Sequence, residues 1–425
     1  MDRFSPRFAS ILLIASFIIL GFQRSYLAIT SSYVADEFNL NYASLGTLGA
    51  AFFYAFAAVQ LPVGIAVDRA GVRRTVGMAL TITALGSILF SIASNPTMAV
   101  VARGLTGAGL GGIYVPALKL FASTQRKDFG VWNGMLIAGG HLGGLVALTP
   151  LLLVTVSFGW RLPMLVVGVL TLVLIPPLLW SLHGWQEPLN LQGQGTRATR
   201  GGGPRQPRVA ASNELARHLL WLLIPYTVIV GHFLAFNSLW AGSYFDTITH
   251  WPEATIGLLL SIFPIALALG APLAGAIADR GLISQSHLTT LGYCGFTLGW
   301  CGLLFVDTRM PPWQVVALLS TMGLMVSCTF VVFAQASAIL GWQSFGLLMG
   351  ILNGVPMLSG AIIQHELGWL THLLADTDIS TSNPLWLAFA LHACLLLLTS
   401  LVAVSQNFRS SGTSLVGDTK EWMRK

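Results

Sequence analysis

Long apolar segments follow one another along this sequence of 425 residues. A bilayer crossing needs about 20 mostly apolar residues. Segments of this kind lie near residues 8–30, 43–66, 72–93, 97–120, 130–155 and 162–182, and then near 217–243, 255–277, 286–306, 313–335, 344–370 and 384–404. The pattern therefore predicts twelve membrane-spanning helices in two sets of six.

A long polar segment separates the two sets. It runs from about His183 to Arg217 and contains the stretch GQGTRATRGGGPRQPR. A segment so rich in Gly, Pro and Arg cannot bury enough apolar surface to fold, so we expect a mobile cytoplasmic linker. The predicted organisation is an N-terminal six-helix bundle over 1–182, a linker over 183–216, a C-terminal six-helix bundle over 217–404 and a cytoplasmic tail over 405–425.

The composition also indicates a membrane protein. Hydrophobic residues make up 54% of the chain and charged residues only 9%, whereas soluble domains carry about 25% charged residues. So few charges cannot cover a large water-facing surface, and the remaining surface must face lipid. We therefore expect an all-α membrane protein. The four cysteines form no CxxC motif, so the sequence indicates neither a disulfide framework nor a metal site.

Basic residues are distributed unevenly between the two sides of this arrangement. Of the 22 Lys and Arg residues, 17 fall on the side of the termini, and only Arg161 and Arg309 fall on the other. The positive-inside rule then predicts cytoplasmic termini and a multi-pass protein of the inner or plasma membrane. The net charge of +6 follows from this topology, so we expect no nucleic-acid partner. The expected partners are the lipid bilayer and a small-molecule substrate, and the expected state is a monomer.

A short motif recurs at equivalent places in the two halves. Gly64, Asp68 and Arg69 lie in the stretch GIAVDRAG after the second predicted span. The stretch GAIADRG, with Asp279 and Arg280, follows the eighth span. An internal repeat of six spans is typical of transporters whose solute site lies between two bundles.

The first copy of this motif resembles the loop signature of the major facilitator superfamily, G-x-x-x-D-R-x-G-x-R-R. The matching residues are Gly64, Asp68, Arg69, Gly71, Arg73 and Arg74. The resemblance implies two bundles related by pseudo-twofold symmetry and a loop that acts as a conformational latch. Asp68 can accept hydrogen bonds from Arg73 or Arg74, or face a helix N-terminus in the other half, and the tight turn needs glycine at Gly71. The second copy lacks the trailing basic pair, which predicts a weaker latch.

Several spans resemble the anion:cation symporter branch of that superfamily. The similar segments are Phe22–Leu27 in the first span, Gly46–Pro62 in the second, Arg103 with Gly107 and Pro116 in the fourth, and Trp160 with Arg161 at the start of the sixth. The branch often has carboxylates, implicated in proton coupling, where this chain has Gln23 and Leu110. Their absence argues against proton symport through those two positions.

Two arginines are predicted to lie inside spans, where a charge is costly and indicates function. Arg24 lies about six residues before the outer end of the first span and Arg103 about six residues after the outer start of the fourth. Both are expected about 9 Å below the membrane surface. Two guanidiniums at one depth repel each other unless an anion lies between them, and their planar donors suit carboxylate or phosphate. The alternative for Arg103 is that it braces helix ends through backbone carbonyls.

Other polar residues complete the predicted solute site. They are Tyr26, Tyr54, Tyr114, His232, Asn237 and Asn353. His141 and His232 are the possible proton carriers, because no acid falls in the central half of a predicted span. Ordinary packing is the alternative role for each of these residues. Glycines four residues apart in spans four, five and eleven, among them Gly107 and Gly143, predict close helix contacts and moving seams.

The preferred function is secondary active transport of a small anionic solute by rocker-switch alternating access. The solute is expected to be an organic carboxylate, a phosphate ester or an inorganic anion. One alternative is a facilitator or exporter of a neutral or zwitterionic solute with structural arginines, and another is a sensor that binds without transport. The sequence shows no serine elbow, HExxH motif, paired carboxylates or GxxxxGK[ST] loop, so no enzyme, cofactor or ATP-driven pump is indicated.

Overall fold

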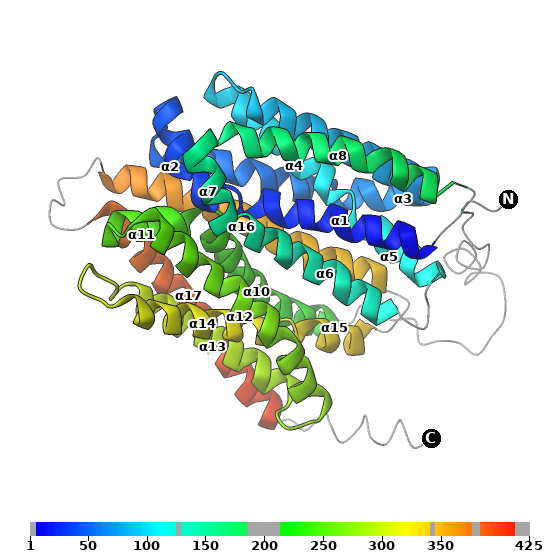
Figure 1. Ribbon diagram of the computed structural model, residues 1–425. Helices are drawn as coiled ribbons and strands as arrows, with labels where there is room; N and C mark the ends of the chain where they lie inside the picture. Colours follow the sequence, from blue (N-terminus) through cyan, green and yellow to red (C-terminus); the bar gives the residue numbers. More distant parts are fainter. Residues whose placement is uncertain are drawn as a thin grey trace, which may run out of the picture.

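The computed structural model describes residues 6–124, 129–183, 185, 213–340, 345–375 and 383–412. Every regular element within these ranges is a helix, as predicted (Figure 1). The first half contains α1 (Pro6–Ser25), α2 (Leu27–Phe38), α3 (Tyr42–Ser91), α4 (Pro96–Gly111), α5 (Tyr114–Thr124), α6 (Phe129–Val146), α7 (Thr149–Phe158) and α8 (Arg161–Ser181). The second half contains α10 (Asn213–Ala235), the π-helical turn η3 (Phe236–Trp240), α11 (Ala241–Thr249), α12 (Glu253–Asp279), α13 (Gln285–Leu303), α14 (Pro312–Thr329), α15 (Val332–Leu340), α16 (Phe345–Ala375) and α17 (Pro384–Gly412).

Several predicted spans are broken or joined. Within the described residues, eight helices are long and apolar enough to cross a membrane, or nine if α6 and α7, bent by 41°, form one span. α3 alone contains 50 residues, about 75 Å of helix, which far exceeds the roughly 30 Å of a bilayer core. Its backbone leaves the helical conformation at Gly71 (φ 78°, ψ 165°). α3 therefore holds the second and third spans, joined by the glycine turn that the sequence predicts.

The ends of the first and last spans differ from the prediction. α1 ends at Ser25, and after a break at Tyr26 α2 continues to Phe38 instead of ending near residue 30. α17 likewise continues to Gly412, past the predicted end at 404. Hydropathy misses these ends because polar residues near a membrane surface remain helical while their neighbours stop being apolar. Arg24 consequently lies at the break between α1 and α2, and not about six residues before the outer end of one continuous helix.

The helices form two groups. Figure 1 shows α1–α8 (blue to green) as one group and α10–α17 (green to red) as the other, with α16 packed along α3 between them. We call these the first and second bundles. The predicted linker at 183–216 and the tail after Gly412 lie almost wholly outside the described residues.

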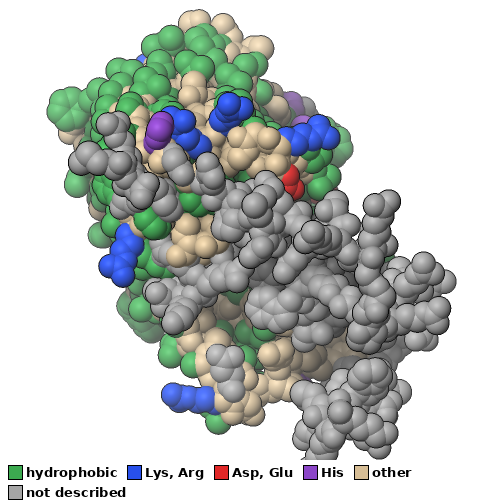
Figure 2. Space-filling model, turned by 90° about the vertical axis from the view of Figure 1, so that its right-hand side faces the viewer, with side chains coloured by type: hydrophobic (Ala, Val, Ile, Leu, Met, Phe, Trp, Pro, Cys, Tyr) green, Lys and Arg blue, Asp and Glu red, His purple; other side chains and the backbone are tan. Residues whose placement is uncertain are grey.

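The two ends of the molecule differ in charge. One end carries exposed arginines, and we call it the basic face: Arg69, Arg73, Arg74 and Arg280. Figure 2 looks onto this end and shows several Lys and Arg side chains. The turns that follow α2, α7 and α11 contain Asn39, Gly159 and His250, which have positive φ. These turns lie at the other end, which we call the opposite face (Figure 1).

Glycines let the two bundles meet closely near the opposite face. A Cβ atom placed at Gly242 in α11 would lie 1.9 Å from the carbonyl oxygen of Ala28 in α2. One placed at Gly368 in α16 would lie 2.4 Å from the carbonyl oxygen of Tyr42 in α3. Both distances are too short for any side chain, so these glycines permit backbone contact between the bundles.

The glycines predicted as moving seams in spans four and five pack elsewhere. A Cβ at Gly107 would lie 2.0 Å from the carbonyl oxygen of Phe52, and one at Gly143 would lie 1.8 Å from that of Ile18. Both contacts are between helices of the first bundle. These glycines thus hold one bundle together. Gly354 in span eleven, from the same predicted set, does lie between the bundles, because an added Cβ there would lie 3.2 Å from Cγ of Gln60 in α3.

Candidate functional site

Arg24 lies in the last turn of α1, at the junction with α2. Its side chain is half-buried, and its Nε is fully buried with no hydrogen-bond acceptor among the described residues. No carboxylate in this part of the chain forms an ion pair with it. A cation held in this way inside a membrane span is costly unless another group neutralises it.

His141 approaches Arg24 from the neighbouring helix. A Cβ at Gly21 of α1 would lie 1.7 Å from the carbonyl oxygen of Gly140 in α6, so the two backbones touch one turn from Arg24. The His141 ring is half-buried, and His141 directly follows Gly140 in α6. The structure therefore brings together two of the predicted site residues.

Arg103 is a buried residue with protein partners. It is 1% exposed, and its Nη1 donates a 2.9 Å hydrogen bond to the carbonyl oxygen of Gln23. Its guanidinium lies 4.8 Å from the centre of the Phe52 ring. These contacts match the bracing role that the sequence analysis left open: Arg103 binds the carbonyl of the residue before Arg24 and so ties the end of α1 to α4.

The side chain of Gln23 is also anchored. Its Nε2 donates a 2.7 Å hydrogen bond to Ser87 in the later part of α3, and the residue is fully buried. Gln23 replaces the carboxylate that the resemblance led us to look for. It contributes to fixing the backbone of α1 next to Arg24.

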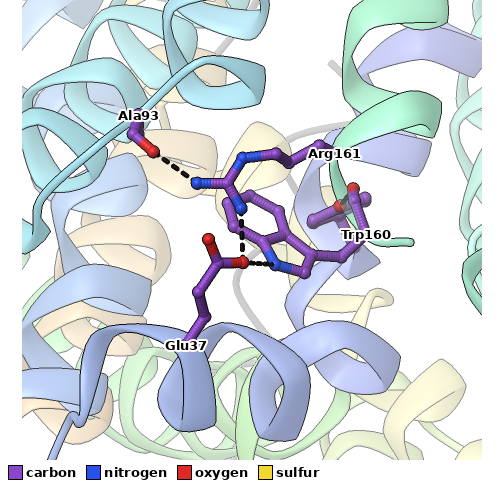
Figure 3. Close-up of polar contacts among 5 residues, drawn as sticks. Glu37, Ala93, Trp160 and Arg161 are labelled. Atoms are coloured by element: carbon purple, nitrogen blue, oxygen red, sulfur yellow. Dashed lines mark hydrogen bonds and ion pairs between the residues drawn. The ribbon is translucent and has the colours of Figure 1, made fainter.

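The α1–α2 break is held by a polar network at the opposite face (Figure 3). The Tyr26 hydroxyl donates to the carbonyl oxygen of Trp160, at the start of α8. The Trp160 indole and Arg161 both donate to Glu37 Oε2 near the end of α2, and Arg161 also donates to the carbonyl oxygen of Ala93. Tyr26 is fully buried, so the hydroxyl predicted for solute binding anchors the break instead.

Two of the remaining predicted residues of the first bundle have other neighbours. Tyr54 is exposed on the same side of α3 as Leu61 and Ile65, and its ring packs against His365 in α16 of the second bundle. The Tyr114 hydroxyl donates a 3.4 Å hydrogen bond to Asn133 Oδ1.

His232 belongs to a buried pair of imidazoles in the second bundle. Its Nδ1 lies 2.8 Å from the carbonyl oxygen of Val228, and its Nε2 lies 3.0 Å from His392 Nδ1. Since a carbonyl only accepts, His232 carries its proton on Nδ1 and accepts from His392 in the neutral pair. The Trp300 ring packs edge-on against His232. Both ring nitrogens are engaged, and His392 was not expected from the sequence.

The π-helical turn η3 carries Asn237, which is 9% exposed. η3 contacts α1 and α3 of the first bundle and α16 of its own. Gln364 of α16 donates a 2.7 Å hydrogen bond to Ser238 in this turn. Sequence reasoning missed Gln364, although an amide in the apolar run of α16 was a usable signal. Asn353, further along α16, is half-buried.

The loop signature adopts a different pairing from the one expected. Asp68 accepts a 2.7 Å hydrogen bond from Lys119 of α5, not from Arg73 or Arg74. Arg73 Nε donates to the carbonyl oxygen of Leu179 at 3.0 Å. Both contacts stay within the first bundle, so the loop does not bridge the bundles through them.

The other residues of the two motifs are mostly exposed or have special backbone conformations. Arg69 and Arg74 are exposed, and so is Arg280 in the second copy. Gly281 has a positive φ of 66°, as Gly71 has in the first copy. The described residues leave the space beside Gly64 open. The side chain of Asp279 lies outside the described part of the structure.

Curated relatives match parts of the chain. It is 30% identical over 176 residues to the gentisate transporter of Corynebacterium glutamicum, covering 40% of this chain and 39% of that protein. It is 24% identical to the probable sulfoacetate transporter SauU of Cupriavidus necator, covering 62% and 63%, and 25% identical to the membrane sensor protein UhpC of Salmonella typhimurium, covering 57% of each. The matched regions thus span less than two thirds of each of these relatives.

Solved structures share the fold over nearly the whole chain. The D-xylose–proton symporter superposes with a TM-score of 0.73 at 15% identity and covers 94% of this chain and 97% of its own. A bacterial homologue of the human lysosomal transporter Spinster, in its inward-facing and occupied conformation, gives 0.69 at 15% identity, covering 96% and 97%. The model of the Major Facilitator Superfamily matches residues 12–363. The chain belongs to the major facilitator superfamily.

Proposed function

We propose that this protein is a secondary active transporter of a small organic anion and that Arg24 binds the anionic group of the solute. One observation carries the proposal: the Arg24 guanidinium has neither a hydrogen bond nor a carboxylate partner among the described residues, whereas Arg103, whose Nε is also buried without an acceptor, binds the Gln23 carbonyl through Nη1. An anion from solution removes the cost of this unpaired charge. Arg103, whose guanidinium already binds a protein carbonyl, acts as a support for Arg24.

The solute class follows from the donor geometry. A guanidinium presents parallel N–H donors that match the two oxygens of a carboxylate. Two relatives are named for gentisate and sulfoacetate, and both of these compounds carry a carboxylate. Organic carboxylates therefore come before phosphate esters and inorganic anions as the proposed solutes.

The proposed transport cycle is alternating access by rocking of the two bundles. The glycine contacts at Gly242 and Gly368 close the opposite face in this structure. Opening that face requires the bundles to separate there and to approach each other at the basic face. Because the basic face carries the exposed residues Arg69, Arg73, Arg74 and Arg280, we assign it to the cytoplasm, where the loop signature then lies.

His141 is the proposed proton carrier. The backbones of α1 and α6 touch at Gly21 and Gly140, so a proton on this ring would place a second positive charge close to Arg24, and the two charges repel unless an anion is bound. Solute binding therefore favours protonation, and protonation favours solute binding, which is the reciprocity that symport requires. His232 is less suited, because both of its nitrogens already have partners.

Binding and flux measurements on purified protein test the proposal. We expect gentisate or sulfoacetate to raise the melting temperature of the wild type and to be taken up by proteoliposomes, and we expect Arg24→Gln to abolish both effects. Arg309→Gln, in an exposed turn, is the matched control and should behave as wild type. A neutral or zwitterionic compound that binds wild type and Arg24→Gln equally would contradict the proposal and favour the facilitator alternative.

A sensor is the second candidate function, because a relative named as a membrane sensor matches 57% of the chain. A sensor binds its ligand without moving it. Binding that depends on Arg24 without any uptake into proteoliposomes would support the sensor, whereas uptake would exclude it.

A further inference from the structure

Gln364 lies in the middle of α16 and is buried, with 1% of its surface exposed. Its Nε2 donates a 2.7 Å hydrogen bond to Ser238 Oγ. Its backbone carbonyl accepts a 3.1 Å hydrogen bond from the Trp240 indole. Ser238 and Trp240 both belong to η3, so a single residue of α16 holds this turn by two hydrogen bonds.

A π-helical turn needs such a support. π-helical turns are rare and occur mostly at functional sites. Ser238 also links Gln364 to α10, because its hydroxyl donates to the carbonyl oxygen of Leu234 in the last turn of that helix. A π-helical turn contains one residue more than an α-helical turn. If η3 became α-helical, the helix on one side of it would have to rotate by about 100° about its axis, and the side chains there would point in new directions. The directions of the η3 side chains therefore depend on the bond from Gln364.

Asn237 is the polar residue that this support orients. It is 9% exposed, and the described residues provide its amide with no hydrogen-bond partner. η3 lies against both α1 and α2, the two helices on either side of the break that follows Arg24. The second bundle thus contributes an unpaired amide, that of Asn237, and the first bundle contributes an unpaired guanidinium, that of Arg24. Together they suit a solute with an anionic group and a separate group that forms hydrogen bonds with an amide.

The free oxygen of Gln364 faces the first bundle. Oε1 has no hydrogen-bond partner among the described residues, and a Cβ at Gly49 of α3 would lie 3.0 Å from it. A Cβ at Gly46 would lie 2.8 Å from the Gln364 carbonyl oxygen. Gln364 therefore lies at the contact between the bundles, where rocking changes its surroundings together with those of η3.

We propose that Gln364 is a positioning residue for solute binding, which holds η3 so that Asn237 binds a second, oxygen-bearing group of a solute whose carboxylate is bound by Arg24. The solute class is accordingly a small carboxylate with a second oxygen-bearing group, such as a hydroxyl or a sulfonate. This inference rests on the proposed function. Gln364 acts through η3 and does not itself contact the solute.

The test compares variants that remove this hydrogen bond with one that removes a similar bond elsewhere. Gln364→Met, Ser238→Ala and the double variant remove the bond between the Gln364 side chain and Ser238, whereas the bond from Trp240 to the Gln364 backbone carbonyl remains in all three. Gln335→Met is the matched control, because Gln335 donates a 2.7 Å hydrogen bond to Thr289 in the same bundle, away from η3. Two quantities are measured: backbone hydrogen exchange over residues 234–242 without solute, and the Kd and maximal uptake rate with gentisate and sulfoacetate.

We expect Gln364→Met and Ser238→Ala each to speed exchange over 234–242 and to raise the Kd about tenfold, with little change in the maximal rate. The double variant should be no worse than Ser238→Ala, because that single variant already loses the bond from Gln364 as well as the bond to Leu234. Gln335→Met should leave both quantities unchanged. An unaltered Kd in Gln364→Met, with binding lost in Arg24→Gln, overturns the inference and leaves the proposed function standing. Binding retained in Arg24→Gln, or no binding of either probe to the wild type, overturns both.

Discussion

The Tyr33 hydroxyl donates a 2.6 Å hydrogen bond to Glu253 Oε2 and so joins α2 of the first bundle to α12 of the second. The contact lies at the opposite face, beside a cavity of about 350 Å³ lined by residues of α2, α11 and α12. Two hydroxyl pairs cross the same seam: Ser31 with Ser243 at 3.3 Å and Thr149 with Ser261 at 3.4 Å. These contacts must break when this face opens, so they stabilise the closed arrangement.

Tyr33→Phe should shift the protein toward opening at the opposite face. The bond is solvent-exposed, so its loss should cost the closed arrangement about 1 kcal/mol, or roughly a fivefold change in the equilibrium. The measurement is the rate at which a membrane-impermeant maleimide labels a cysteine introduced at Ser243, in a cysteine-free background. Tyr244→Phe is the control, because Tyr244 donates to the Leu303 carbonyl within the second bundle. Equal labelling rates in the two variants would exclude a gating role for Tyr33.

Gly242→Ala should prevent full closure of the opposite face. A Cβ at this position would lie 1.9 Å from the Ala28 carbonyl oxygen, and backbone atoms cannot move aside as a flexible side chain can. The readout is disulfide formation between cysteines placed at Ser31 and Ser243, which we expect to be fast in the parent and lost in the variant. Gly134→Ala, where the described residues leave open space, should cross-link normally. Fast cross-linking in Gly242→Ala would contradict the prediction.

In the absence of solute, substitution of Arg24 and substitution of Arg103 should affect the melting temperature differently. Arg103→Gln removes a charged hydrogen bond to the Gln23 carbonyl, which contributes about 1.5–3 kcal/mol, so the melting temperature should fall by several degrees. Arg24→Gln removes an unpaired, half-buried charge and should leave the melting temperature unchanged or raise it. The two values are measured side by side by thermal denaturation in detergent. A fall of similar size in both variants would show that Arg24 is also a structural residue.

The Glu37–Arg161 contact should support the α1–α2 break more strongly than a typical surface ion pair. Both side chains are partly exposed, so the ion pair alone should contribute under about 1 kcal/mol. Arg161 also binds the Ala93 carbonyl and stacks 4.2 Å from the centre of the Trp160 ring. We therefore expect Arg161→Leu to destabilise the protein by more than Glu37→Gln does. A double-mutant cycle on the melting temperature isolates the ion pair, and equal losses in the two single variants would argue against the added contacts.

Local patterns in the sequence were sufficient for the architecture. Apolar segments of bilayer length predicted the spans, because burial in lipid depends on the average hydropathy of a helix and little on its neighbours. The turn at Gly71 was predictable as well, since a positive φ of 78° is available to glycine without strain. The breaks at Tyr26 and in η3 were not, because both depend on partners far away in sequence, Trp160 and Gln364.

The roles of the candidate residues needed the tertiary structure. The sequence by itself determined that Arg24 and Arg103 lie inside spans without an obvious acidic partner, because both facts follow from composition along the chain. It did not determine that Arg103 reaches the Gln23 carbonyl, 80 residues away, that His232 pairs with His392, or that Asp68 binds Lys119. Such pairings depend on which helix faces touch. Because hydropathy is nearly the same on all sides of a lipid-embedded helix, helix packing alone decides which polar groups meet.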